Sequence, residues 1–392
     1  MFSGVPMEQV ITSKLKLFPN KEQIKLLEET TSTYISTINQ IIENKTKNNI
    51  DLPYSSKDIS ANLPSCLKAQ IIIDSKSIIK KIKKTKKIPI LKKPIAVWNN
   101  QNFDVIFENN KFYIRFNIIL NGKSKKINVL TKVNDFQQAY LDFTQNKKGT
   151  LRITKKSNDW FAQISITTQC DEIAESNNVI MGVDLGLKVP AVAVTSDNKT
   201  KFFGNGRQNK FIRRKYRTLR KSLGKKKLNK KIKEIGNKEQ RWMINEDHKI
   251  SKQIVNFAVS NNVAVIRLEE LFGIRQTAKT SRKNNRSLHS WSFARLSSFI
   301  HYKASRKGIV VEYVNPAYTS QICPQCGNKH KANDRKYKCP NCGFTAHRDR
   351  VGAMNIIKAP IISGKSLLAV SVKDTADGGV LTNPNLGVIL EL

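Results

Sequence analysis

Two pairs of cysteines near the C-terminus constrain the fold of this chain more than any other feature of its sequence. They read Cys323-Pro-Gln-Cys326 and Cys339-Pro-Asn-Cys342, and a glycine follows each pair. Four thiolates at this spacing close a tetrahedral shell around one Zn²⁺, and the glycines allow the tight turns that aim the sulfurs at one point. Because such a shell leaves no open coordination position, the sequence predicts a structural zinc ribbon, which we assign to residues 319–345.

Two histidines flank this predicted ribbon and offer alternative zinc ligands. His330 falls between the cysteine pairs, and His347 follows the second pair. Either could replace a cysteine, but the ligand set is complete without them. We therefore expect His347 to contact phosphate or to cap the helix that follows it.

The second constraint is charge. The chain carries a formal net charge of +39 over 392 residues, a length that suits two or three domains. Such an excess repels itself in the compact state, so we expect a polyanion in the working form, with nucleic acid as the first candidate. A membrane surface is the competing polyanion. The sequence shows no long apolar run, signal peptide or lipidation motif, so we expect no membrane partner.

Cysteine usage predicts the compartment. Four of the six cysteines lie in the two pairs, which suits a reducing, cytoplasmic environment. The other two are Cys66 and Cys170, which we expect to be small buried apolar residues rather than a disulfide.

The N-terminal half predicts β-structure that carries two inserted helices. Residues 9–17 alternate as a strand, and a helix begins after Asn20, its expected N-cap, with Gln23 reaching back. A second helix is predicted over residues 64–87. From 96–168 the hydrophobic period changes to two, with Asn-rich and Ser-Asn-Asp turns, which predicts a small antiparallel barrel or sandwich that includes the first strand.

The C-terminal half predicts an α/β domain. Strands are expected at 179–184, 190–194 and 201–203. The basic stretch 213–238 is interrupted by glycines and predicts a helical hairpin. An amphipathic helix follows, and then a strand that ends at Glu269.

Two of the predicted helical segments carry dense positive charge. A basic run at a helix end is often only a solvated tip, but on a chain this basic we expect contacts with phosphates. The residues expected to make them are Lys80, Lys83 and Lys84 at the end of the second inserted helix, and Lys210, Arg213, Arg214, Arg217 and Arg220 in and beside the hairpin.

Three acidic residues fall at expected ends of elements. Asp184 and Glu269 each close a strand, and Asp349 precedes a helical segment. Neighbouring strand ends of an open α/β sheet are where sites form. Singly, each residue has a structural explanation: a turn residue, a surface carboxylate, or an ion pair with Arg348 or Arg350. Together, with a strand-strand-strand-helix-strand order beside a polycation, they predict an RNase H-like nuclease domain.

Such a site would use metal ions. Three carboxylates can hold two Mg²⁺ roughly 3.5–4 Å apart, one to activate a water nucleophile and one to stabilise the leaving oxygen. Hard cations prefer oxygen ligands, so we expect the acidic residues and not the cysteines to hold them. Glu246, Asp247 and Glu270 are rival carboxylates that spacing alone does not exclude.

The sequence resembles transposon-encoded TnpB (OrfB) proteins, relatives of the compact type V CRISPR effectors. The resemblance runs from about Val179 to Ala359 and extends more weakly to the segment 17–23 and the β-structure. Besides the cysteine pairs, it rests on Gly182-Val-Asp-Leu-Gly186, Leu268-Glu-Glu-Leu271, His289-Ser-Trp-Ser-Phe293, Asn315-Pro-Ala-Tyr-Thr-Ser-Gln321 and the segment from Asp349 to Ile356.

The resemblance implies a multidomain fold, α/β plus β-barrel. An RNase H-like (RuvC) nuclease domain would comprise residues 178–318 and 346–361, with the four-cysteine ribbon (319–345) inserted as a target nucleic-acid-binding domain. An N-terminal wedge domain, an OB-like β-barrel, would comprise residues 1–18 and 93–170. A helical recognition lobe (19–92) would be inserted in it, and residues 362–392 would form a C-terminal tail.

The resemblance also implies the roles of the acidic residues. In the family, three motif carboxylates form a split catalytic site, and they fall here on Asp184, Glu269 and Asp349. Many relatives carry an acidic residue where His347 stands in this chain. All three motif carboxylates are present, so we expect the site to be intact.

The implied activity is RNA-guided DNA cleavage by a prokaryotic transposable element. A transposon-derived guide RNA, one per protein, would pair with one strand of target double-stranded DNA beside a short flanking motif. Two alternatives stay open: a guide-directed repressor that binds without cutting, and a conventional transposase that needs no guide. The intact carboxylates argue against the repressor.

Overall fold

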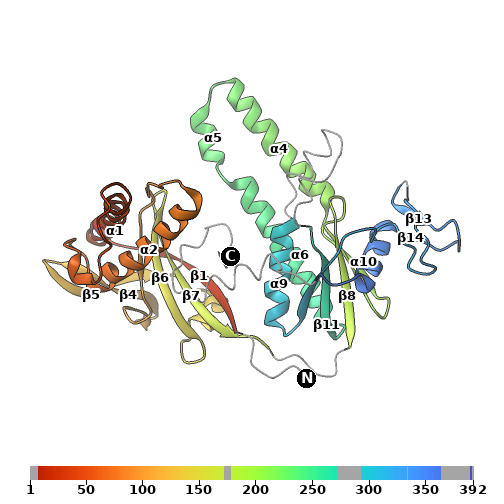
Figure 1. The fold of residues 1–392 in the computed structure, drawn as a ribbon, viewed down its shortest axis with the longest axis horizontal. Helices are drawn as coiled ribbons and strands as arrows, with labels where there is room; N and C mark the ends of the chain where they lie inside the picture. The colour runs from red at the N-terminus through yellow and green to blue at the C-terminus, as the bar shows by residue number, and fades with distance from the viewer. Residues whose placement is uncertain (1–7, 172–177, 272–292, 333, 363–388, 391–392) are drawn as a thin grey trace. The chain divides into compact units, whose positions relative to one another are not determined.

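The computed structural model describes residues 8–171, 178–271, 293–332, 334–362 and 389–390. The segments 172–177 and 289–292 and most of the expected tail lie outside the described residues. The chain divides into two compact units, built mainly from Glu8–Gln169 and Cys170–Ser371 (Figure 1). In the described ranges, none of the helices is long and apolar enough to cross a membrane.

An eight-stranded sheet forms the first unit. Its order is β2-β6-β7-β1-β5-β4-β3, and β15 pairs with β1. The strands are β1 (Glu8–Phe18), β2 (Ile95–Trp98), β3 (Phe103–Glu108), β4 (Lys111–Leu120), β5 (Lys123–Thr131), β6 (Lys147–Lys156), β7 (Asp159–Gln169) and β15 (Ile389–Leu390). The predicted strands are therefore confirmed, and the first strand belongs to the sheet as expected.

The closed barrel is not shown. β1 pairs with β7 from Glu8 to Leu17 but with β5 only at Leu17 and Phe18, so two register positions join the halves of the sheet. Among the described strands, the hydrogen-bonded path is open and ends at β2 and β3. The period-two pattern predicted the strands correctly, but it carries no information on whether the two outer strands meet.

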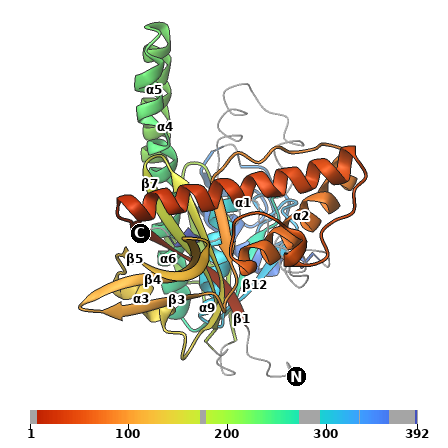
Figure 2. The ribbon, with the colours of Figure 1, turned by 90° about the vertical axis from the view of Figure 1, so that its left-hand side faces the viewer.

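Two long helices are inserted between β1 and β2, as predicted. They are α1 (Lys21–Lys47) and α2 (Ser65–Thr85), joined through the short 3₁₀ helix η1 (Ser56–Asp58). Asn20 and Gln23 form the expected capping box: Asn20 Oδ1 accepts from the Gln23 amide at 2.8 Å, and Gln23 Oε1 accepts from the Asn20 amide at 3.1 Å. α1 packs against α2 and β2 (Figure 2). A further short helix, α3 (Asp135–Leu141), was not predicted.

A five-stranded mixed sheet forms the centre of the second unit. Its order is β10-β9-β8-β11-β12, with β8 antiparallel to β9 and parallel to β11. The strands are β8 (Val179–Leu185), β9 (Ala191–Thr195), β10 (Thr200–Phe203), β11 (Val263–Glu269) and β12 (Val310–Val314). The predicted order of three strands, a helical region and a fourth strand is confirmed.

Helices cover both faces of this sheet. α6 (Lys238–Val259) and α9 (Phe293–Arg306) share a core with Met181 and Val183 of β8. α10 (Arg348–Lys358) contacts β8 through Gly182, whose neighbours in the strand point to the other core. Because side chains alternate along a strand, α10 lies on the face opposite α6 and α9, as Figure 1 shows.

The basic segment forms the predicted helical hairpin. α4 (Gly206–Lys225) and α5 (Asn229–Ile235) lie side by side as an arm of the second unit in Figures 1 and 2. The chain turns at Lys227, which has a left-handed backbone with φ 54°, and Gly236, with φ 46°, ends α5. A separate two-stranded sheet, β13 (Lys336–Lys338) and β14 (Thr345–His347), follows β12.

Candidate functional site

Asp184 and Glu269 lie next to each other at the ends of two parallel strands. Leu268 of β11 is in register with Val183 of β8, so the following residues, Glu269 and Asp184, are neighbours. Adjacent strands are about 4.8 Å apart, and residues in register on parallel strands point to the same face. Both carboxylates are therefore on the face that α10 covers.

α10 brings Asp349 to the same place because two glycines allow a close approach. A Cβ at Gly182 would lie 2.1 Å from the carbonyl oxygen of Ala353, and a Cβ at Gly352 would lie 2.9 Å from Oδ2 of Asp184. Asp349 is in the first turn of α10, three residues before Gly352, and so shares its face of the helix. Any side chain at either glycine would push the helix or the carboxylate away.

The electrostatics of the site reflect this crowding. Burial, followed by the negative charges of Glu269 and Asp349, raises the pKa of Asp184 well above its usual range. Burial also raises the pKa of Glu269, while the hydrogen bond from Thr319 lowers it. The structure thus places Asp184 within electrostatic reach of the other two predicted carboxylates, Glu269 and Asp349, in a setting that favours added positive charge.

Two of these carboxylates have partners that sequence reasoning missed. The Thr319 hydroxyl donates to Glu269 Oε1 at 2.5 Å. The Arg335 guanidinium, from the loop before β13, forms an ion pair with Asp349, which is 7% exposed. The alternative explanation of Asp349, an ion pair with Arg348 or Arg350, is not found among the ion pairs of the described residues. The contact between Arg335 and Asp349 is a tertiary one, and no local sequence pattern signals it.

The three carboxylates do not form a closed ligand set. In the described parts of the chain, the only group of at least three potential ligand residues with all ligand atoms within 4.8 Å of one another is the four cysteines. Asp184, Glu269 and Asp349 are therefore gathered but more widely spaced. Their oxygen donors still suit a hard divalent cation such as Mg²⁺.

The rival carboxylates are in different settings. Asp247 and Glu246 lie on α6, on the other side of the sheet; Asp247 pairs with Arg295 at 2.6 Å and Glu246 with Lys249 at 2.9 Å. Glu270 follows Glu269, and its backbone amide donates to Val314 at 2.9 Å.

The four predicted cysteines converge on one point. Sγ of Cys323 lies 3.6 Å from that of Cys342, and Sγ of Cys326 lies 3.5 Å from that of Cys339. Zn–S bonds of about 2.3 Å in a tetrahedron place sulfurs about 3.8 Å apart, so the cluster fits structural zinc. A hydrogen bond from the Cys342 amide is the main cause that lowers the pKa of Cys339 to about 6, which favours the thiolate.

The two histidines of the ribbon region and the two cysteines outside the pairs have structural roles or settings. His347 is the N-cap of α10, and its Nδ1 accepts from the Asp349 amide at 3.3 Å, which confirms the capping expectation. His330 packs against Tyr337 with ring centroids 6.2 Å apart. Cys66 and Cys170 are free and partly rather than fully buried, and burial raises the pKa of both thiols.

The basic residues expected to contact phosphates divide into two groups. Lys80, Lys83 and Lys84 of α2 and Lys210, Arg214 and Arg217 of α4 are exposed, as a phosphate contact requires. Arg213 and Arg220 instead line a pocket. Arg220 forms an ion pair with Glu239, and burial lowers the pKa of the Arg213 guanidinium.

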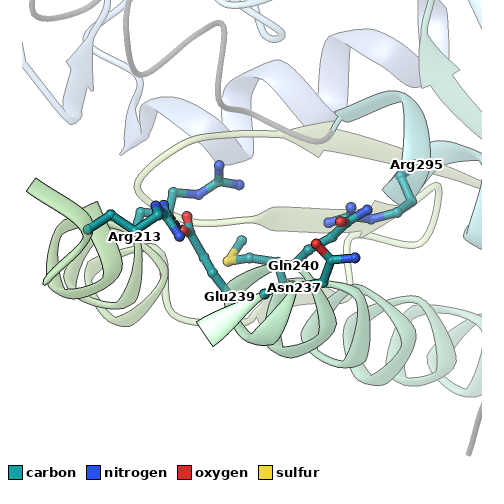
Figure 3. A pocket seen from close by; sticks show the side chains of 8 residues that line it. Arg213, Asn237, Glu239, Gln240 and Arg295 are labelled. Atoms are coloured by element: carbon teal, nitrogen blue, oxygen red, sulfur yellow. Dashed lines mark hydrogen bonds and ion pairs between the residues drawn. The ribbon is translucent and has the colours of Figure 1, made fainter. Parts of the chain in front are cut away.

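This pocket lies between α4, α6 and α9 and has a volume of about 310 Å³. Figure 3 shows Arg213 and Arg295 on opposite sides of it, with Asn237 and Gln240 between them. Its lining residues are Arg213, Arg220, Gly236, Asn237, Glu239, Gln240, Met243 and Arg295. Since Arg220 and Arg295 already pair with carboxylates, much of its positive charge is neutralised within the protein.

The chain is similar in sequence to several known proteins. The family model described as "Cas12f1-like, TNB domain" matches residues 293–356, which contain the cysteine cluster. A TnpB-like protein of Methanocaldococcus jannaschii is 38% identical over 149 residues, 37% of this chain and 53% of that protein. The CRISPR-associated endodeoxyribonuclease Cas12f1 of Sulfoacidibacillus thermotolerans is 28% identical over 218 residues, 51% of this chain and 50% of that protein.

The fold has a counterpart among solved structures. The protein in a cryo-EM structure of a Cas12f1–sgRNA–target DNA complex superposes with a TM-score of 0.65 at 16% identity, over 87% of this chain and 83% of that chain. The chain spans about half the length of the curated relatives it matches. Together these matches show that the chain is similar in sequence to TnpB-like and Cas12f1 proteins and shares its fold with the protein of the solved complex.

Proposed function

We propose that the protein is an RNA-guided DNA endonuclease that hydrolyses phosphodiester bonds at Asp184, Glu269 and Asp349. The observation that carries the proposal is the gathering of these three carboxylates from β8, β11 and α10, where burial, followed by the charges of Glu269 and Asp349, raises the pKa of Asp184. Close, buried carboxylates are stabilised in their charged form by nearby positive charge, so such a site favours the binding of cations.

The residues have distinct roles in this proposal. Two Mg²⁺ held by the three carboxylates would supply the Lewis acidity for the displacement. The Thr319 hydroxyl orients the Glu269 carboxylate, and the His347 ring caps the helix that carries Asp349. Arg335 supplies a cation beside Asp349, where the charge of a bound phosphate would be neutralised.

The domain roles are part of the same proposal. The RNase H-like (RuvC) nuclease domain comprises residues 178–318 and 346–361, and the zinc-holding ribbon at 319–345 binds target nucleic acid. Residues 1–18 and 93–170 form the OB-like wedge, and 19–92 the recognition lobe. Because the hydrogen-bonded path of the eight-stranded sheet is open, the wedge assignment is supported by the order of the strands and not by closure of a barrel.

The proposed partners are a transposon-derived guide RNA, one per protein, and target double-stranded DNA. The net charge of +39 requires a polyanion, and a guide–target duplex supplies one. The related protein of the solved complex carries sgRNA and target DNA. The exposed lysines and arginines of α2 and α4 are the proposed phosphate contacts.

The test is guided cleavage. The protein is expressed with the DNA that flanks its gene, co-purifying RNA is sequenced, and a plasmid with the matching site is incubated with the complex in Mg²⁺. We expect linearisation by the native protein and only background cutting by Asp184→Ala and Glu269→Ala. Undiminished cutting by these variants would exclude the site.

The same experiment decides between the alternatives. Tight guided binding without nicking by the native protein would identify a repressor. Absence of a discrete bound RNA, together with strand joining, would identify a conventional transposase.

A further inference from the structure

Tyr318 has an unusual backbone for an aromatic residue. Its φ is 63°, in the left-handed region, and it is the only aromatic residue with positive φ in the described part of the chain. The other described residues with positive φ are glycine, asparagine, lysine or serine. A side chain with a Cβ is disfavoured there, whereas glycine and asparagine adopt this backbone readily. Glycine or asparagine would therefore form this turn at a lower energetic cost than tyrosine.

The surrounding hydrogen bonds hold Tyr318 in this conformation. Its carbonyl oxygen accepts from the amides of Gln321 at 2.8 Å and Ile322 at 3.1 Å. On the other side, the Asn355 side chain on α10 donates to the carbonyl oxygen of Thr319 at 2.7 Å. Strain of this kind persists only where the surroundings fix the conformation, and it concentrates at functional sites.

Tyr318 directly precedes a residue that contacts the carboxylate site. Tyr318 is 50% exposed, and the next residue, Thr319, is the one whose hydroxyl holds Glu269. The Lys329 ammonium lies 3.1 Å from the centroid of the Tyr318 ring. An exposed ring with a lysine against it offers both a stacking surface and a cation for a neighbouring phosphate.

We infer that Tyr318 stacks on an unpaired nucleobase of a DNA strand entering the carboxylate site, and that Lys329 contacts the adjacent phosphate. This inference rests on the proposed function, because it names the occupant of the same site. Stacking on an aromatic ring tolerates any base, which suits an enzyme whose sequence selection resides in a guide. Tyr318 is thus a positioning residue for the strand that is cut.

The test distinguishes the effect of the aromatic ring of Tyr318 on DNA binding from its effect on the stability of the turn. A short single-stranded DNA carrying 2-aminopurine is titrated with the full, zinc-loaded chain in buffer without Mg²⁺, so that binding and fluorescence are read without cleavage. Tyr318→Asn removes the ring but suits the left-handed backbone, so its Tm should equal or exceed that of the native protein. We expect about tenfold weaker binding and loss of the fluorescence quench.

Three further variants control this result. Tyr318→Phe keeps the ring and should bind and quench like the native protein, and Tyr318→Leu, apolar but not aromatic, should lose both. Tyr54→Asn changes a tyrosine that is 94% exposed in the other unit and should change neither. Native-like binding and quenching by Tyr318→Asn, or no binding of this DNA by the native protein, would overturn the inference. If the Tyr318→Asn protein binds this DNA like the native protein and still performs guided cleavage, the inference is wrong while the proposed function is supported.

Discussion

Gly352 of α10 faces the carboxylate of Asp184 on β8, and a Cβ at Gly352 would lie 2.9 Å from Oδ2 of Asp184. The helix that carries Asp349 can approach the strand only because this position lacks a side chain. Gly352→Ala should therefore displace the Asp184 carboxylate or the helix. We expect guided cleavage to fall about 100-fold, since a misplacement of about 1 Å can have that effect.

The stability cost of this substitution should be smaller than its effect on cleavage. Overpacking costs about 1–3 kcal/mol, which lowers Tm by a few degrees. Gly224→Ala is the matched control, because a Cβ there meets nothing closer than Ile232 Cδ1 at 4.0 Å. Equal cleavage by the two alanine variants would show that the contact with Asp184 is unimportant.

The raised pKa of Asp184 predicts a specific pH dependence of stability. The folded protein holds a proton on Asp184 at pH values where the unfolded chain, with a pKa of about 3.9, has lost it. The stability that this group contributes is therefore lost as the pH rises from about 3.9, the pKa in the unfolded chain, through the higher pKa of Asp184 in the folded protein. Asp184→Asn carries no charge at any pH, so it should melt at a higher temperature than the native protein near neutral pH without Mg²⁺.

The measurement is Tm as a function of pH for both proteins, with zinc present. The advantage of Asp184→Asn should grow from about pH 4 upward. Added Mg²⁺ should raise the Tm of the native protein and have little effect on the variant. Parallel curves for the two proteins, with and without Mg²⁺, would refute the electrostatic account.

Zinc content should depend on the cluster and on no other cysteine. Cys339→Ser removes one of four converging sulfurs and should lower bound zinc well below one ion per chain, as read by elemental analysis. The ribbon also carries Arg335, so cleavage should fall as well. Cys170→Ser is the control, since its thiol is free and distant in sequence from the pairs, and should leave the zinc content unchanged.

Salt dependence should distinguish exposed from paired arginines on α4. Replacing Arg214 and Arg217, which are exposed, with glutamine should flatten the slope of log K against log salt on duplex DNA by about 0.9 for each lost phosphate contact. Replacing Arg220, which pairs with Glu239, should change the slope little. Equal slopes for all variants would show that this arm does not contact the backbone of DNA.

Local patterns predicted much of the fold. The Asn20–Gln23 capping box began α1 as expected, and left-handed asparagines at 109, 110 and 121 make the predicted turns. The strand before Glu269 was recognised because a buried run of β-branched residues ends in an acid. These signals are short-range, so a single sequence contains them.

Longer-range features were not predictable in the same way. A second capping box, Asn134 with Gln137, begins α3, but a helix of 7 residues is too short to show a clear hydrophobic period. Closure of the first sheet depends on whether its outer strands, β2 and β3, pair with each other, and the period-two pattern of a strand does not reveal its partners. The hydrophobic period of α4 distinguishes its sides, but it does not reveal that Arg213 and Arg220 turn toward α6.

The residues of the candidate site also divide into those predictable from local sequence and those that depend on tertiary contacts. Asp184, Glu269 and Asp349 were identified from their places at element ends and from the family resemblance. Arg335, Thr319 and the strained backbone of Tyr318 depend on how the ribbon region folds back against α10 and β11. Such tertiary contacts have no periodic signature in the sequence.

The central claim is that Asp184, Glu269 and Asp349 together hold divalent cations. The most direct measurement is anomalous diffraction from crystals of the protein soaked in Mn²⁺. We predict two peaks roughly 3.5–4 Å apart, both in contact with these carboxylates. Manganese bound elsewhere, with no peak between β8, β11 and α10, would contradict the account.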